Sequence, residues 1–209
     1  AVYLFNGSTA PNNKNVIRYI HLGEESEINK RYLTASRSPW YAIENRPPAP
    51  IWVSVFSRSG LRFIRNQSII YYLTSFHCVY SLYTEVDIEV LFAYLITDVA
   101  KDIFLDNSRQ YGNGLIKFEP NDLNKGMVVD LTLLSTEESS FVKDVYAFIK
   151  ETLNEKVGKQ LLNDFFLLKY TSGINMLDVF YKRLQDLKDI SLSITDELVK
   201  RTSKSNAKQ

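Results

Sequence analysis

The alternation of apolar and polar residues makes the first part of the chain typical of strands joined by irregular segments. Val2–Phe5 is a short apolar run, and Val16–Leu22 alternates, so we expect a strand in each. The polar stretch Glu24–Tyr32 is expected to hold a short helix. Four prolines within Ser36–Pro50 exclude a regular helix there and predict an irregular connection.

Two neighbouring runs then predict a β-hairpin. Ile51–Phe56 is aromatic and β-branched, and Leu61–Asn66 alternates after the polar turn Ser57–Gly60. The following run, Ile69–Tyr83, is rich in Tyr, Phe, Ile and Val. We expect it to form one or two further strands that cover the hairpin.

Helical spacing of apolar residues begins after residue 83. Glu85–Phe104 predicts one helix with Thr84 as its N-cap. Ser135 and Glu138 have the spacing of a capping box at the start of another helix. The helices of the last third are expected at Ser135–Leu153, Lys159–Tyr170 and Ile174–Val199.

Shorter elements lie between these helices and at the end of the chain. Arg109–Asn113 predicts a glycine-marked turn, Leu115–Glu119 a short strand, and Pro120–Leu123 a turn of helix. The polar tail Arg201–Gln209 is expected to be disordered. The pattern predicts an α+β protein: a small, mostly antiparallel β unit at 1–83 and a helical unit at 84–209 packed on it, the two forming either separate domains or one composite domain.

The distribution of charged residues along the chain adds an indication of function. The 209 residues carry a net charge of only +1, yet residues 1–83 hold nine Lys and Arg against four Glu. Seven of the ten arginines lie between Arg18 and Arg65. The planar guanidinium fork suits guanine edges and phosphates, so this clustering favours a nucleic-acid surface. A solvated face laced with salt bridges is the alternative explanation.

The single cysteine, Cys78, excludes an internal disulfide and fits a reducing cytoplasm. No stretch reaches the roughly 20 apolar residues that a membrane span requires. The chain opens without Met in what looks like the middle of a strand. We therefore expect it to be a fragment of a longer protein.

The sequence gives little support to catalysis by this chain. His77 and Cys78 are neighbours in a predicted strand, so their side chains point to opposite faces and do not form a nucleophile pair. With His21, these three residues are too few for a usual zinc site, so no metal is expected. Neither GxxxxGK[ST] nor GxGxxG occurs, and Tyr111–Gly114 is better explained as a turn than as a phosphate loop.

The residues with the best placement for contacting a polyanion lie in and before the predicted hairpin. Arg58 is at its tip, whereas Arg62 and Arg65 fall on opposite faces of the second strand, so one of them is expected to be structural. Trp40 and Tyr41 either pin their loop or stack on a base.

Several segments occur in the order that is typical of one family. RSPWY, the apolar strand after it, LRFIRN, LTSFHCVY and RQYGNGLIKFEPNDL resemble the C-terminal target-recognition region of adenine-specific (N6) DNA methyltransferases. These belong to bacterial type II restriction–modification systems, in the gamma, TaqI-like class. The resemblance spans about residues 16–130, and the last segment is its most specific part.

The resemblance implies a DNA-reading part separated from its catalytic domain. In such enzymes an Asn-Pro-Pro-Tyr motif and a glycine-bearing loop for S-adenosylmethionine precede this region, and neither is present here. Asn45-Arg46-Pro47-Pro48 is not that motif. We therefore expect no catalytic residue and no cofactor in this chain, with double-stranded DNA and the missing catalytic domain as partners. From charge and loop position, the expected DNA-binding residues are Lys14, Arg37, Tyr41, Arg46, Arg58, Arg62, Arg65 and Asn66.

Two other functions stay open. The amphipathic run Ile174–Val199 is typical of a helix that binds another protein, which favours an assembly role, for instance with a restriction subunit. A self-contained enzyme is disfavoured by the missing catalytic residues.

Overall fold

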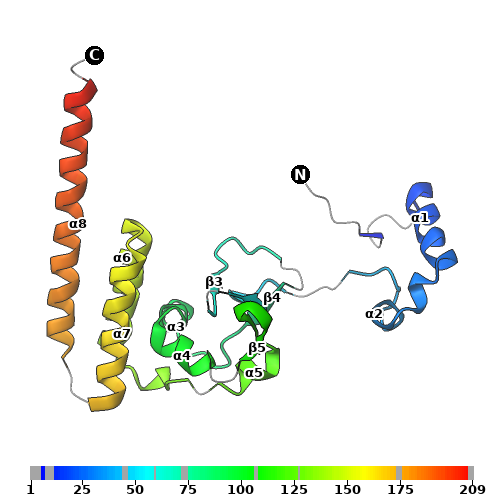
Figure 1. The fold of residues 1–209 in the computed structure, drawn as a ribbon, viewed down its shortest axis with the longest axis horizontal. Helices are drawn as coiled ribbons and strands as arrows, with labels where there is room; N and C mark the ends of the chain where they lie inside the picture. The colour runs from blue at the N-terminus through cyan, green and yellow to red at the C-terminus, as the bar shows by residue number, and fades with distance from the viewer. Residues whose placement is uncertain are drawn as a thin grey trace. The chain divides into compact units, whose positions relative to one another are not determined.

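The structure is a computed structural model, and it describes residues 6–7, 12–43, 47–58, 60–71, 75–105, 108–126, 128–172 and 176–206, without the side chains of 201–206. The chain forms two compact units, residues 1–47 and 48–209. Among the described residues, the first unit contains two α-helices with a 3-10 helix between them, and the second contains two small sheets and the remaining helices (Figure 1).

The first described element is a helix where we predicted a strand. It is α1, Lys14–Glu25, and the expectation for residues 16–22 is therefore wrong. The Asn13 carboxamide oxygen accepts hydrogen bonds from the backbone N–H groups of Asn15 (2.9 Å) and Val16 (3.4 Å), so it caps the helix. The strand expected at residues 2–5 lies outside the described residues.

Short helices and an aromatic contact complete the first unit. After α1 come η2, Ile28–Lys30, and α2, Tyr32–Ala35, which agree with the short helix expected in this region. The Trp40 ring packs against Gly23 so closely that a Cβ at Gly23 would overlap it. The Trp40 indole N–H also donates to a Glu24 carboxylate oxygen (3.2 Å). Trp40 therefore pins its loop to α1.

The predicted hairpin is present at the start of the second unit. Strand β1, Ile51–Ser54, pairs antiparallel with β3, Phe63–Arg65, and Trp52 lies opposite Ile64. Strand β4, Phe76–Val79, pairs with the other edge of β1 and does not cover the hairpin as a separate layer. This sheet, with strand order β3-β1-β4, is called sheet A.

A second sheet, sheet B, has the strand order β2-β6-β5. Its strands are β2 at Phe56–Ser57, β5 at Arg109–Tyr111 and β6 at Leu115–Lys117. We predicted a turn over residues 109–113, but the first three of these residues form β5. The turn itself is the 3-10 helix η3, Gly112–Gly114, which joins two antiparallel strands.

The single helix predicted over residues 85–104 is two helices, α3 at Ile88–Leu95 and α4 at Asp98–Leu105. Asp87 and not Thr84 caps α3, because its carboxylate accepts from the Glu89 N–H (2.8 Å). The break has a local and a tertiary contribution. The Thr97 hydroxyl accepts from the Ala100 N–H (3.2 Å) and so caps α4, and the Asn163 side-chain oxygen of a distant helix accepts from the Asp98 N–H (2.7 Å).

The remaining helices agree with the predicted pattern, apart from the 3-10 helix at Leu131–Leu133, which we did not predict. They are α5 at Pro120–Asn124, η4 at Leu131–Leu133, α6 at Thr136–Thr152, α7 at Glu155–Ser172 and α8 at Leu177–Asn206. The capping box of Ser135 and Glu138 is confirmed. Helix α8 includes residues 201–206, for which we expected disorder, and residues 207–209 lie outside the described part.

One hydrophobic core joins sheet A to the helices of the second unit. Val53 and Phe63 of sheet A belong to the same buried cluster as Tyr94 of α3, Phe141 of α6 and Phe166 of α7. Helices α6, α7 and α8 run side by side (Figure 1), and their aromatic rings meet within 6 Å, as with Phe141 and Phe180 at 5.8 Å. The α+β fold class is confirmed. None of the described helices is long and apolar enough to cross a membrane.

Candidate nucleic-acid interface

Two of the predicted DNA-binding arginines lie exposed on the connection between β2 and β3. The chain turns at Gly60, whose φ of +90° favours glycine. Arg62 stands between the buried side chains of Leu61 and Phe63, so alternation directs it to solvent. Arg58 precedes the turn and is also exposed. Within the described residues, neither arginine is engaged in a hydrogen bond or an ion pair.

The surroundings of Arg62 extend to the first turn of α7. The pKa of Glu155 is lowered, first by its hydrogen bond with Lys159 and to a smaller extent by the positive charges of Lys101 and Arg62. Arg62 therefore lies within electrostatic reach of Glu155, as do Lys101 and Lys159. Lys101 pairs with Asp98 (3.5 Å) and Lys159 with Glu155, so among these three cations only Arg62 has no ion pair within the described residues.

Arg65 points inward instead. Its Nε and Nη2 donate to one carboxylate oxygen of Glu89, at 3.1 and 3.0 Å, and its Nη1 donates to the Pro50 carbonyl oxygen (2.8 Å). The Arg65 side chain is only 15% exposed. It ties the end of β3 to α3 and to the segment before β1, which agrees with the prediction that one of these arginines is structural.

Asn66 is also occupied by the fold. Its side-chain NH₂ donates to the carbonyl oxygens of Ala49 and Ile70, both at 2.9 Å, and its side-chain oxygen accepts from the Ile70 N–H (3.1 Å). These bonds close the loop after β3. Within this loop Ile69 has a φ of +52°, a conformation that is costly for a β-branched residue.

An open cleft of about 370 Å³ lies beside these two residues. Its walls are the Pro48–Pro50 segment and the loop from Arg65 to Ile69, with Glu89 contributed by α3. The cleft thus contains a paired Arg and Glu, whose charges cancel. Its chemistry is polar and near neutral, which does not favour a phosphate over other ligands.

The remaining candidates belong to the first unit. Lys14 is exposed at the start of α1. Arg37 donates from Nη1 to the Ala42 carbonyl oxygen (3.2 Å), and the Tyr41 ring lies edge-on to Trp40 with 5.6 Å between centroids. Arg46 lies outside the described residues. The eight candidates are therefore divided between the two units.

The structure also exposes polar residues that we did not single out from the sequence. Arg109, Gln110 and Tyr111 of β5 are all exposed at the edge of sheet B. The Gly-Asn-Gly turn, whose residues tolerate a positive φ, is the signal that could have placed a hairpin here.

His77 and Cys78 are placed as strand residues of β4. A ring nitrogen of His77 lies 2.9 Å from the Phe118 carbonyl oxygen, which links β4 to the end of sheet B. Cys78 lies opposite Trp52 in the sheet. Across the described ranges, no three His, Cys, Asp or Glu residues are grouped so that they could hold a metal ion.

Comparison with known proteins shows the family to which this chain belongs. The model of the C-terminal domain of the Type II methyltransferase M.Eco57I matches residues 1–164. The chain is 58% identical over 167 residues to the Type II methyltransferase M.AccI of Acinetobacter calcoaceticus, which is 78% of this chain and 31% of that relative. The chain thus spans about a third of the length of the curated relative it matches. No solved structure matches it. The chain belongs to the family of C-terminal domains typified by the Type II methyltransferase M.Eco57I.

Proposed function

We propose that this chain is the DNA sequence-recognition domain of an adenine-N6 DNA methyltransferase from a bacterial restriction–modification system. In this proposal, methyl transfer and S-adenosylmethionine binding belong to a catalytic domain outside the chain. The protein acts in the cytoplasm, where its partners are double-stranded DNA and that domain. Membership in a methyltransferase C-terminal family supports the proposal.

One observation on the molecule carries the DNA-binding part. Arg58 and Arg62 are exposed on one short connection and are engaged in no ion pair within the described residues. An arginine that already forms an ion pair would have to break that pair to bind DNA, at a cost in free energy. Exposed arginines without an ion pair are therefore the ones available to phosphates and guanine edges. Arg65 and Asn66, in contrast, hold the end of β3 and the loop after it through Glu89 and the backbone. Lys14, Arg37, Tyr41 and Arg46 are further proposed contacts, contributed by the first unit.

The test is a binding titration of the whole chain with fluorescent duplex DNA over a range of salt concentrations. The double variant Arg58→Ala/Arg62→Ala removes two phosphate contacts. We expect the slope of log K against log[salt] to become shallower by about 1–2.

The matched control is Lys182→Ala/Lys200→Ala, which removes the same charge from exposed positions of α8. It should leave the slope unchanged. Equal effects of the two double variants would show that only net charge matters and would overturn the assignment of Arg58 and Arg62.

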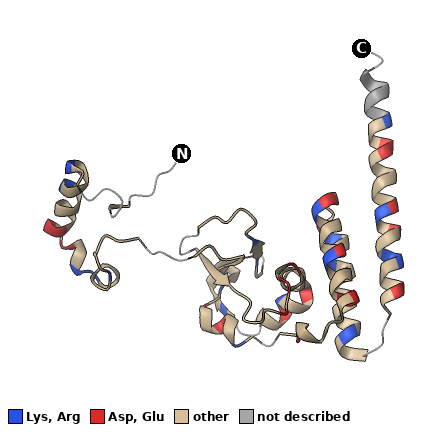
Figure 2. Cartoon of the chain, turned by 180° about the vertical axis from the view of Figure 1, so that it is seen from behind, with Lys and Arg blue, Asp and Glu red and all other residues tan. Residues whose placement is uncertain are grey.

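A second candidate function rests on α8. This helix lies beyond the residues that the family model matches, and its side chains Ile190, Leu192 and Ile194 are each more than half exposed. Figure 2 shows basic and acidic residues interspersed along α8, which suits a protein partner better than a polyanion. In this alternative the chain assembles through α8, either with a second copy of itself or with another protein.

Sedimentation separates this alternative from the first proposal. If α8 mediates self-assembly, the wild-type chain sediments faster as its concentration rises, and Ile194→Lys abolishes that dependence. A concentration-independent monomer would count against self-assembly through α8.

A further inference from the structure

The hairpin formed by β5 and β6 is an exposed two-stranded ribbon. Its register pairs Arg109 with Lys117 and Tyr111 with Leu115, and the turn between the strands is Gly112–Gly114. Strand β5 is the edge of sheet B, so one side of the ribbon has no neighbouring strand within the described residues. All three residues of β5 are exposed, and those of β6 are half-buried.

Neither the backbone conformation nor the packing of the fold requires a glycine at position 112. Asn113 and Gly114 have φ values of 61° and 69°, so the turn itself requires residues that tolerate the left-handed region. Gly112 lies outside that region, and a Cβ added to it would meet no described heavy atom within 4 Å. Other glycines differ, since a Cβ at Gly158 would overlap Ile149.

One use of glycine at an exposed position is to let the backbone approach another molecule closely. The chemistry around Gly112 indicates which kind of molecule. Residues 109–118 contain Arg109 and Lys117 and no acidic residue. Side-chain amides lie on both sides of the glycine, at Gln110 and Asn113.

These groups suit the edges of base pairs. Asn and Gln pair bidentately with adenine in the major groove, and Arg pairs with guanine. The groove is about 12 Å wide and admits a two-stranded β-ribbon. A protein partner would be expected to find exposed apolar residues at the tip, yet of the two large apolar side chains beside the turn Tyr111 is half exposed and Leu115 half-buried.

Ion pairs fix the end of the ribbon that lies away from the turn. Arg109 Nε lies 3.5 Å from a carboxylate oxygen of Asp122, which sits in the capping box of α5. Lys117 pairs with Glu119, and this hydrogen bond raises the pKa of Lys117. Both contacts lie at the end of the ribbon away from the turn, so they fix its direction and leave the tip exposed.

We infer that the tip of the β5–β6 hairpin enters the DNA major groove and determines sequence specificity. Gln110 and Asn113 contact base edges, and Gly112 lets the backbone approach the DNA without a side chain in between. This inference rests on the proposed DNA-recognition function and adds the element that reads the sequence.

The test separates specificity from folding and from electrostatic binding. The whole chain first selects a duplex from a random-sequence pool, and affinities for the selected duplex and a scrambled duplex are then compared. Because a methyl group at Gly112 enters open space, Gly112→Ala should leave the unfolding midpoint unchanged or raised. We expect Gly112→Ala and Gln110→Ala each to lower the ratio of the two affinities about tenfold, with binding to the scrambled duplex unchanged.

Gly114→Ala is the contrasting variant, because its φ of +69° makes any side chain strained and the unfolding midpoint should fall. A Gly112→Ala protein that keeps the wild-type affinity ratio would overturn the inference while leaving the DNA-recognition function standing. Failure of the wild-type chain to select any duplex would contradict the proposed function itself, and the inference with it.

Discussion

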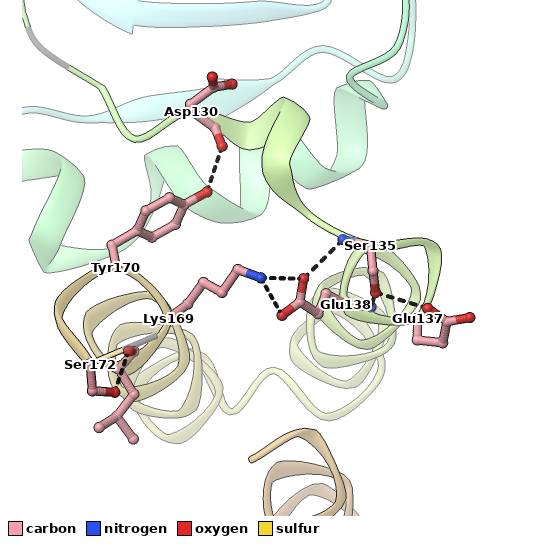
Figure 3. Close-up of polar contacts among 8 residues, drawn as sticks. Asp130, Ser135, Glu137, Glu138, Lys169, Tyr170 and Ser172 are labelled. Carbon is pink, nitrogen blue, oxygen red and sulfur yellow. Dashed lines mark hydrogen bonds and ion pairs between the residues drawn. The ribbon is translucent and has the colours of Figure 1, made fainter. Parts of the chain in front are cut away.

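The contact between Glu138 and Lys169 gives a sharp test of how the second unit is held together. Glu138 is buried at the start of α6, where one carboxylate oxygen accepts from the Ser135 N–H (2.9 Å). Both oxygens accept from the Lys169 ammonium group of α7, at 2.7 and 2.8 Å (Figure 3). One side chain therefore caps a helix and joins two helices.

The cost of removing Glu138 follows from these contacts. Loss of a capping interaction costs about 1 kcal/mol. A hydrogen bond to a charged group contributes about 1.5–3 kcal/mol, and we take about 2 because Lys169 remains 28% exposed and can be rehydrated. Glu138→Ala should thus lower the free energy of unfolding by about 3 kcal/mol, or the melting temperature by about 9 °C.

Urea unfolding followed by circular dichroism at 222 nm measures this change. Glu138→Gln keeps an acceptor for the Ser135 N–H and should lose less than Glu138→Ala. The control is Glu137→Gln, which alters the neighbouring exposed carboxylate that only accepts from the Ser135 hydroxyl group (2.8 Å). Indistinguishable midpoints for Glu138→Ala and Glu137→Gln would refute the reasoning.

Three further predictions concern single side chains. Asn163→Ala removes a hydrogen-bond acceptor from the first turn of α4, which the Thr97 hydroxyl still caps, and should lower the free energy of unfolding by about 1 kcal/mol, measured by urea unfolding. Burial raises the pKa of Tyr170 to about 12, so folding stability should fall as the pH rises from about 10 to 12, and thermal melts of Tyr170→Phe should show a smaller fall, since buried Tyr94 and Tyr146 also have raised pKa values. Asn66→Ala unties three hydrogen bonds of a buried side chain, so amide hydrogen exchange should accelerate in the loop after β3, whereas Gln67→Ala, which alters an exposed side chain, should not change it.

The sequence predicted those structural features that depend on residues only a few positions apart. The capping box at Ser135 is an example, as is the hairpin of β1 and β3 around the glycine turn. The prediction was wrong where one segment fits both a strand pattern and a helix pattern. The alternation of residues 16–22 also places Val16, Ile20 and Gly23 on one helical face, and the Asn13 cap favours the helix.

Long-range partners explain the other differences. The start of α4 is bound not only by the local cap Thr97 but also by Asn163, which is 65 residues from the backbone N–H of Asp98 that it binds. Charge clustering alone could not distinguish exposed Arg62 from Arg65, because the partner of Arg65 is Glu89 on another element. The sequence therefore predicted the region that holds the candidate arginines. The structure shows which of them is exposed, Arg62, and which is engaged by the fold, Arg65.

The central claim is that the exposed arginine connection of this methyltransferase C-terminal domain binds DNA. The most direct measurement is the titration of the whole chain into fluorescent duplex DNA at 50 and 200 mM salt. The account predicts binding that weakens steeply with salt and loses part of that dependence in Arg58→Ala/Arg62→Ala. Absence of binding at the lower salt, or binding that does not respond to salt, would contradict it.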